Sequence, residues 1–121
     1  MKYKNKIHHS FKFAFNGIVQ ALRDNRNLRI HVFIGILVFI LSFVLGLTKI
    51  EKIVVMVMIM LVISAEMINT ALEEMTDLIT EEHKQEAKAA KDVAAGMVLV
   101  TAIGAIIVGI VIFVPYIIEL L

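Results

Sequence analysis

Several residue types and motifs are missing from this sequence, and their absence removes whole classes of protein. There is no cysteine among the 121 residues, which excludes disulfide scaffolds and thiol chemistry. Pro115 is the single proline, and neither a phosphate-binding P-loop nor a clustered glycine fingerprint is present. The four histidines show no metal-ligand spacing with one another.

Charged residues are scarce and apolar residues abundant. The sequence is 60% hydrophobic and 19% charged, whereas a soluble domain usually holds about half its residues as apolar and roughly a quarter as charged. A soluble core of this size has no room for the excess isoleucine, valine, leucine and methionine, so burial in a bilayer is the simpler account. The length fits one domain, residues 1–121.

Three stretches are candidates for transmembrane helices, since a bilayer core about 30 Å thick needs roughly 20 apolar residues in a helix. Residues 30–47 are interrupted only by His31 and Ser42, and residues 93–118 hold no charge. Residues 53–72 are apolar as far as Ala65 and then become polar. We expect an all-α integral membrane protein with spans at about 30–47, 53–72 and 93–118, and a tight hairpin at residues 48–52.

A fourth helix is predicted ahead of the spans, at residues 8–23. Apolar side chains recur there at helical spacing with polar residues between them; they are Phe11, Ala14, Phe15, Ile18, Val19 and Leu22. Such an amphipathic helix suits the membrane surface, and packing on the other helices is the alternative. The polar stretch Arg23–Arg29 is expected to serve as a hinge into the first span.

Basic residues are distributed unevenly about the spans. Seven precede the first span, three lie between the second and third, and two lie in the expected hairpin; these are, in turn, Lys2, Lys4, Lys6, Lys12, Arg23, Arg26 and Arg29, then Lys84, Lys88 and Lys91, then Lys49 and Lys52. Lysine and arginine accumulate on the cytoplasmic side of membrane proteins. We expect a multi-pass protein of the bacterial plasma membrane, with its N-terminus in the cytoplasm and its C-terminus outside.

A polar stripe runs along the second span. At about 100° per residue, one helix face carries Glu66, Asn69, Glu73 and Asp77. An ionised side chain at mid-bilayer costs at least a few kcal/mol, so these carboxylates need a common partner, which is a cation, a proton or a polar ligand.

The depth of the stripe separates two of its carboxylates. Counted from Lys52 at about 1.5 Å per residue, Glu66 lies about 21 Å and Glu73 about 31 Å along the helix axis. In a core about 30 Å thick, Glu66 is then just inside the inner edge of the hydrocarbon and Glu73 is at the interface. A lipid head group can meet the first, and a water-soluble ligand the second.

The motif formed by this stripe resembles the signature of the prokaryotic diacylglycerol kinase family. It reads Glu66-Met-Ile-Asn69-Thr-Ala-Leu-Glu73-Glu-Met-Thr-Asp77, and the spacing to Lys91-Asp92 also matches. The segments at 77–80 and 87–96 look most like the Gram-positive branch, in which the usual substrate is undecaprenol. The resemblance covers the whole chain.

This resemblance implies an enzyme that moves the γ-phosphoryl group of ATP to a lipid hydroxyl at the cytoplasmic face. It implies a magnesium cofactor and a homotrimer with composite sites, in contact with a lipid alcohol, membrane lipids and ATP but with no nucleic acid. Glu66 looks like the base, Asn69 like the group that orients it or the lipid hydroxyl, and Glu73 like a magnesium ligand. The implied ATP contacts are Lys6, Phe13, Glu73, Glu82, His83, Lys84, Lys91 and Asp92.

The sequence departs from the family before the first span. The family commonly has a metal-binding glutamate there, and Asn25 stands at that position. Either the neighbouring Asp24 substitutes for it, or the metal is held more weakly by the Asn25 carbonyl oxygen. If Asn25 occupies a metal site, restoring the acid should lower the magnesium concentration needed for half-maximal rate.

Two other functions compete with an undecaprenol kinase. A diacylglycerol kinase is the first, because diacylglycerol also offers a hydroxyl to Glu66. A non-enzymatic, oligomeric ion or proton conductor would use the stripe as a path. Such a path should continue across the bilayer, and residues 53–65 and 93–118 hold no Asp, Glu, His, Lys or Arg to continue it.

Overall fold

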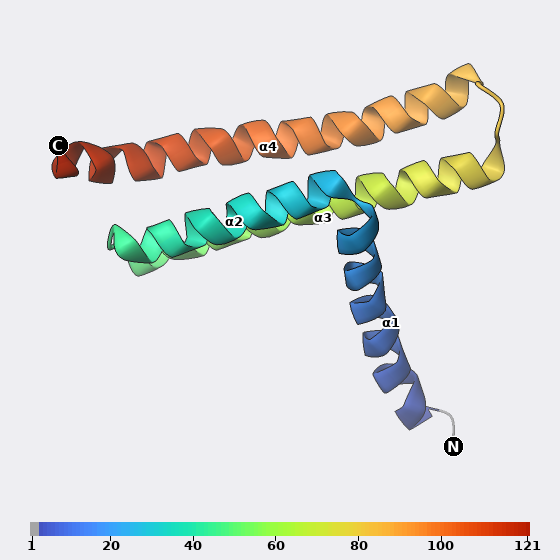
Figure 1. Cartoon of the computed structure of the whole chain (residues 1–121), viewed down its shortest axis with the longest axis horizontal. Helices are drawn as coiled ribbons and strands as arrows, with labels where there is room; N and C mark the ends of the chain where they lie inside the picture. The colour runs from blue at the N-terminus through green and yellow to red at the C-terminus, as the bar shows by residue number, and fades with distance from the viewer. Residues whose placement is uncertain (1–2) are drawn as a thin grey trace.

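The computed structural model describes residues 3–121, with side chains from Lys6 onward, and every element in that part is a helix. The four helices are α1 (Tyr3–Asp24), α2 (Arg26–Val44), α3 (Lys49–Ile79) and α4 (Gln85–Leu120) (Figure 1). The side chains of Lys2 and Lys4, counted above in the charge bias, lie outside the described residues. The prediction of an all-α chain is confirmed.

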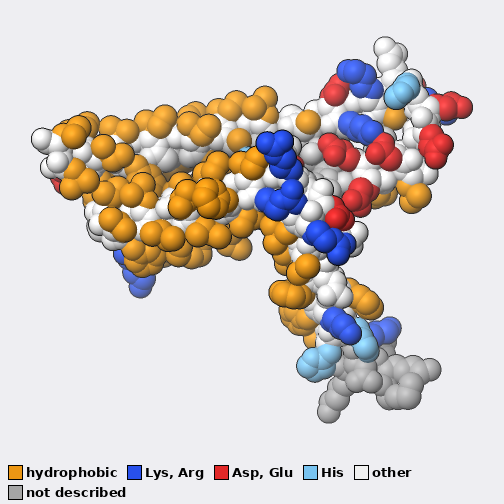
Figure 2. Space-filling model, viewed as in Figure 1, with side chains coloured by type: hydrophobic (Ala, Val, Ile, Leu, Met, Phe, Trp, Pro, Cys, Tyr) orange, Lys and Arg blue, Asp and Glu red, His pale blue; other side chains and the backbone are white. Residues whose placement is uncertain are grey.

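Helices α2, α3 and α4 are each long and apolar enough to cross a membrane. In the most apolar window of α4 only 6% of the residues are buried. Hydrophobic side chains cover these helices on the face shown in Figure 2. Charged side chains gather at the end of α3, at the start of α4 and around the start of α2. Apolar surface this extensive needs lipid or another protein against it.

The connection between α2 and α3 is shorter than predicted. Gly46 has a φ of +72°, which ends α2 in a tight turn. Thr48 then caps α3, since its side chain accepts from the Glu51 N–H and the Glu51 carboxylate accepts from the Thr48 N–H. The predicted tight hairpin is present, but its bounds of 48–52 were wrong: the turn is 45–48, and 49–52 is already the first turn of α3.

Helix α3 is the centre of the bundle, because it packs against both α2 and α4. Near the turn, Leu47, Val55 and Phe113 form a small buried core. Further along, α2 and α3 approach closely at Gly35, where an added Cβ would lie 2.7 Å from Ile59 Cγ2.

Helix α1 turns sharply away from the other three helices (Figure 1). The turn is made by Asn25, whose backbone is extended (φ −114°, ψ 109°). The predicted hinge at Arg23–Arg29 was therefore too long, since Arg26 already begins α2. Within one chain α1 contacts α2 and leaves apolar side chains such as Phe11 and Phe15 exposed. Its placement on a membrane surface stays a prediction.

Helices α3 and α4 continue past the level at which α1 leaves (Figure 1). The predicted spans ended at 72 and resumed at 93, whereas α3 runs to Ile79 and α4 begins at Gln85. We call this extension, residues 73–92, the stem. The ionisable residues predicted to bind ATP through α3, α4 and their loop all lie on the stem.

The close approach at Gly35 gives a test of the packing. Replacement of Gly35 by alanine should destabilise the protein by about 1–3 kcal/mol, because the new methyl group has no room beside Ile59. Gly109→Ala is the matched control, since nothing lies within 4 Å of its added Cβ. Thermal unfolding in detergent should show a lower Tm for Gly35→Ala alone. Equal Tm values for the two variants would mean that α2 and α3 do not meet at this point.

Candidate functional site

Glu66 is the one charged side chain that is buried between residues 6 and 121, with a relative exposure of 4%. It lies on α3 opposite the start of α2. The Asn25 amide nitrogen Nδ2 donates to Glu66 Oε1 at 3.3 Å, and His31 Nε2 lies 3.9 Å from Glu66 Oε2. The contact with His31 was not foreseen, because no spacing in the sequence links the two positions.

Asn25 connects the start of α2 to α3 through further hydrogen bonds. Its Oδ1 accepts from the Leu28 N–H at 3.1 Å, which makes it the N-cap of α2. Its Nδ2 also donates to Thr70 Oγ1, which in turn donates to the Glu66 carbonyl oxygen at 3.0 Å. A polar network therefore surrounds the Glu66 carboxylate at the corner where α1 leaves the bundle.

Asn69 is buried one turn beyond Glu66. Its Nδ2 donates to Glu73 Oε1 at 3.2 Å, so the structure pairs it with Glu73 and not with Glu66. Its Oδ1 is buried and has no hydrogen-bond partner among the described residues. An unsatisfied buried acceptor is unfavourable and calls for a missing partner, and a bound substrate can supply one.

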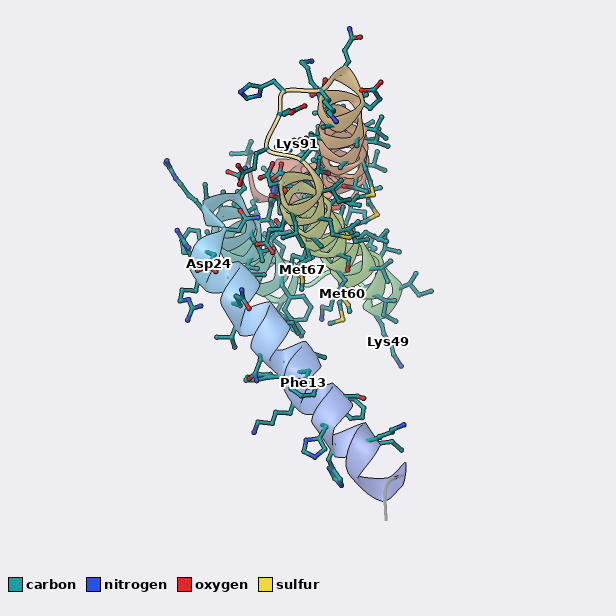
Figure 3. All side chains as sticks on the ribbon, turned by 90° about the vertical axis from the view of Figure 1, so that its right-hand side faces the viewer. Phe13, Asp24, Lys49, Met60, Met67 and Lys91 are labelled. Atoms are coloured by element: carbon teal, nitrogen blue, oxygen red, sulfur yellow. The ribbon has the colours of Figure 1, made fainter. Side chains whose placement is uncertain are left out.

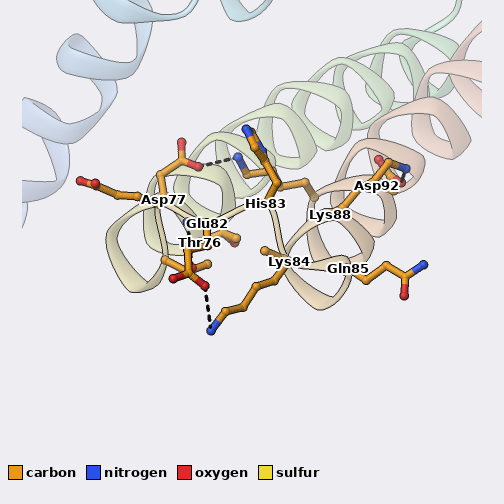
Figure 4. Close-up of a pocket in the computed structure, with 12 residues that line it drawn as sticks. Thr76, Asp77, Glu82, His83, Lys84, Gln85, Lys88 and Asp92 are labelled. Atoms are coloured by element: carbon orange, nitrogen blue, oxygen red, sulfur yellow. Dashed lines mark hydrogen bonds and ion pairs between the residues drawn. The ribbon is translucent and has the colours of Figure 1, made fainter.

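A polar pocket of about 500 Å³ lies on the stem, between the end of α3 and the start of α4 (Figure 4). It brings together five of the predicted ATP contacts, Glu82, His83, Lys84, Lys91 and Asp92. Sequence reasoning missed other lining residues, which include Thr76, Thr80 and Lys88. These residues share a pocket because α3 and α4 both extend past the predicted spans, so that the end of α3 and the start of α4 lie on either side of one loop.

The lysines of this pocket are paired with carboxylates. Lys91 on α4 is bonded to Asp77 on α3, and Lys88 donates to Asp92 at 2.7 Å. The hydrogen bond and charge of Asp92 raise the pKa of Lys88. Four carboxylates and three lysines line the pocket, so it does not attract a polyphosphate by charge alone.

The candidate metal ligands are separated in the structure. Glu73 is exposed on the stem, whereas Asn25 is bonded to Glu66 and Thr70, and Asp24 forms an ion pair with Arg23 at 3.2 Å. No group of three or more histidines and carboxylates in the described residues is arranged to hold a metal. The oxygen donors present fit magnesium, which commonly takes only one or two carboxylates and completes its shell with phosphates and water.

Two predicted ATP contacts on α1 are not brought to the pocket within one chain. Lys6 and Phe13 both lie on α1, and Phe13 stacks on His9 with ring centroids 6.3 Å apart. Figure 3 shows Phe13 partway along α1 and Lys91 away from it on the stem. Neither residue is among those that line the polar pocket.

An apolar groove of about 510 Å³ lies between α2 and α4, with α3 as its floor. Small residues open it on both walls: Gly35 on α2, and Ala102, Ala105 and Gly109 on α4. Its one ionisable lining residue is His31, which also contacts Glu66. Through His31 the groove therefore reaches the polar network around Glu66.

Comparison with known proteins identifies relatives along almost the whole chain. The family described as prokaryotic diacylglycerol kinase matches residues 12–113. The undecaprenol kinase of Bacillus subtilis (strain 168) is 40% identical over 111 residues, which cover 92% of this chain and 90% of that protein. A diacylglycerol kinase of Synechocystis sp. (strain ATCC 27184 / PCC 6803 / Kazusa) is 43% identical over 101 residues, 83% of this chain and 58% of that protein.

A third relative, a diacylglycerol kinase of Haemophilus influenzae (strain ATCC 51907 / DSM 11121 / KW20 / Rd), is 30% identical over 105 residues, 86% of this chain and 89% of that protein. These similarities and the three apolar helices define a membrane lipid kinase. The chain belongs to the prokaryotic diacylglycerol kinase family. The alternative of a non-enzymatic conductor is set aside by this result.

Proposed function

We propose that this lipid kinase uses ATP and magnesium to phosphorylate undecaprenol, with Glu66 as the general base. One observation carries the proposal: Glu66 is a buried carboxylate at the corner where α1 leaves the bundle, between an apolar groove and a polar pocket. The similarity to the undecaprenol kinase of Bacillus subtilis over most of the chain favours undecaprenol. Diacylglycerol is the second candidate, because the other relatives are diacylglycerol kinases.

In the proposed reaction the lipid hydroxyl oxygen forms a bond to the γ-phosphorus of ATP. The bond from that phosphorus to the β,γ-bridging oxygen breaks, ADP leaves with the electron pair, and the hydroxyl proton passes to the Glu66 carboxylate. Phosphoryl transfer depends mainly on positioning and charge neutralisation. The unpaired Asn69 Oδ1 is suited to orient a bound hydroxyl or another donor beside this carboxylate.

The nucleotide is proposed to bind at the stem, where Glu82, His83, Lys84, Lys91 and Asp92 share one pocket. Carboxylates outnumber lysines there, so ATP should bind with its charge already reduced by a cation. Glu73 would hold that magnesium ion, which neutralises charge on the transferred phosphate.

The assembly and orientation proposed for the protein follow from the same residues. Because Lys6 and Phe13 do not reach the pocket within one chain, a homotrimer in which another copy's α1 completes the site is consistent with their proposed role. We place the stem and the N-terminus in the cytoplasm, the C-terminus outside and α1 on the inner membrane surface. The lysines and arginines that support this orientation are concentrated at α1, the α1–α2 corner and the stem.

The role of Glu66 is tested by Glu66→Gln. General-base catalysis contributes roughly 10²- to 10⁴-fold, so turnover should fall by about that factor while ATP affinity stays unchanged. Rates of the parent protein with undecaprenol and with diacylglycerol, measured side by side in detergent, decide which lipid is the substrate. Glu74→Gln is the matched control, since Glu74 is exposed on another face of α3. Near-normal turnover of Glu66→Gln would remove it from the role of base.

The stem is tested by Glu73→Gln and Lys91→Ala. The first should raise the magnesium concentration needed for half-maximal rate, because a carboxylate ligand is lost. The second should raise the KM for ATP by roughly 10- to 100-fold, the size expected for a hydrogen bond to a charged group. Lys49→Ala at the opposite end of α3 is the control. If Glu73→Gln leaves the magnesium dependence unchanged, the metal is held elsewhere.

The groove between α2 and α4 is proposed to hold the hydrocarbon chain of the substrate. It is lined by apolar side chains along its length and ends at His31, which contacts Glu66. A chain lying there has its hydroxyl at the polar end, beside the proposed base. Moving the hydrocarbon chain from bulk lipid into the groove gains little hydrophobic free energy, because both surroundings are apolar. The fit of the chain against the small residues on the groove walls should therefore set which lipid shape the enzyme prefers.

Two valines on α4 test this placement. Val108 lines the groove, whereas Val111 is 69% exposed and does not. Val108→Phe should raise the KM for undecaprenol by roughly tenfold through overpacking, while the KM for ATP and the oligomeric state in detergent stay unchanged. Val111→Phe should leave all three unchanged. A change of oligomeric state in Val108→Phe would mean that another copy occupies the groove.

A further inference from the structure

The side chain of Asn25 makes three hydrogen bonds. Its Oδ1 accepts from the Leu28 N–H at 3.1 Å, and its Nδ2 donates both to Glu66 Oε1 at 3.3 Å and to Thr70 Oγ1. An amide has two N–H donors and a carbonyl oxygen with two lone pairs, so this arrangement uses both donors and one of the two lone pairs. The donors face α3, and the oxygen faces the first turn of α2.

We propose that Asn25 is a positioning residue for Glu66, in place of the metal ligand that the family resemblance implied. The proposal rests on the proposed function of Glu66 as the base. The Asn25 amide holds Oε1 by donating a hydrogen bond to it. Because the amide is the donor in this contact, the amide cannot itself take the substrate proton there. Oε2 lies 3.9 Å from His31 Nε2, beyond hydrogen-bond distance, and remains able to accept from the substrate hydroxyl.

The position of Glu66 explains why a donor is required at residue 25. A general base must lie within hydrogen-bond reach of the proton it takes, and a glutamate side chain has several rotamers available. Because Glu66 is buried and one of its oxygens is bonded across to α2, its carboxylate has a defined orientation. Burial without such a bond would leave the charge unsatisfied, which is unfavourable.

A carboxylate at residue 25 would act differently from this amide. It has no N–H to donate, so it would face Glu66 and Thr70 as an acceptor, and beside Glu66 it would be a like charge. Conversely, a cation bound through Oδ1 would have to use the second lone pair of that oxygen, beside the Leu28 N–H, and would gain no negative charge from the neutral amide. Asn25 is therefore better suited to donating a hydrogen bond to the base than to binding a metal ion.

Helix capping alone is the simplest competing explanation, and one substitution separates the three roles. Asn25→Asp keeps an acceptor for the Leu28 N–H and adds a negative charge at a helix N-terminus, which favours the cap. Capping alone therefore predicts normal activity and equal or greater stability. A metal role predicts a lower magnesium requirement. A positioning role predicts a lower kcat with an unchanged magnesium requirement, because the donor to Glu66 is lost.

The experiment compares Asn25→Asp, Asn25→Ser and Asn25→Ala in the full chain in detergent, with Asn27→Asp as the control on an exposed neighbour. Serine keeps a capping oxygen without adding charge, so it separates loss of the donor from repulsion. We expect kcat to fall about tenfold or more in both Asn25→Asp and Asn25→Ser. The KM values for ATP and lipid and the magnesium requirement should stay within twofold. Tm should fall, because Glu66 loses its donor, but it should stay well above the assay temperature, so that unfolding does not account for the lost rate. Asn25→Ala should lose both kcat and Tm, and Asn27→Asp neither.

Three results would overturn the proposal. Full kcat in Asn25→Asp or Asn25→Ser would reduce Asn25 to a helix cap. A lower magnesium requirement in Asn25→Asp would make it a metal position. If the aspartate and serine variants unfold at the assay temperature to an extent that explains their lower rate, the role of Asn25 is structural. The proposed function is tested separately by Glu66→Gln, because near-normal turnover in that variant would show that Glu66 is not the base.

Discussion

The carboxylate of Glu66 lies buried in α3, where the other buried residues are Val55, Val62, Ala65 and Asn69. A buried charge without partners is unfavourable by several kcal/mol, and the structure places partners on both sides of it. Asn25 caps the start of α2 and His31 lies on α2, and Thr70 links the same network back to α3. The position of α2 along α3 is thus tied to this one side chain, and with it the corner from which α1 departs.

The sequence predicted the helical class and the three apolar spans, because hydrophobic runs of this length have few other outcomes. It was less successful at the helix ends, which depend on local capping. The positive φ of Gly46 and the capping box of Thr48 and Glu51 shortened the hairpin, and the cap at Asn25 reduced the hinge to one residue. The continuation of α3 and α4 into the stem escaped prediction because hydropathy marks where a span ends and not where a helix ends.

The polar stripe was also readable from the sequence, since Glu66 and Asn69 are buried on one face of α3. What surrounds it was not. Asn25 and Glu66 are 41 residues apart, and the contact between them depends on the register of two packed helices, which also approach closely at Gly35 and Ile59. The family resemblance named position 25 as important, but the direction of its hydrogen bonds is visible only in the folded chain.

Helix α3 is one unbroken helix of 31 residues, from the turn with α2 to the end of the stem. Its length and continuity hold Glu66, Asn69, Glu73 and Asp77 in a fixed angular relation. Insertion or deletion of a single residue between them would swing the later side chains by about 100° around the axis, away from α4 and Lys91. Changes in chain length during evolution should therefore be confined to the loop at 80–84, which joins two helices without setting the direction of any of these four side chains.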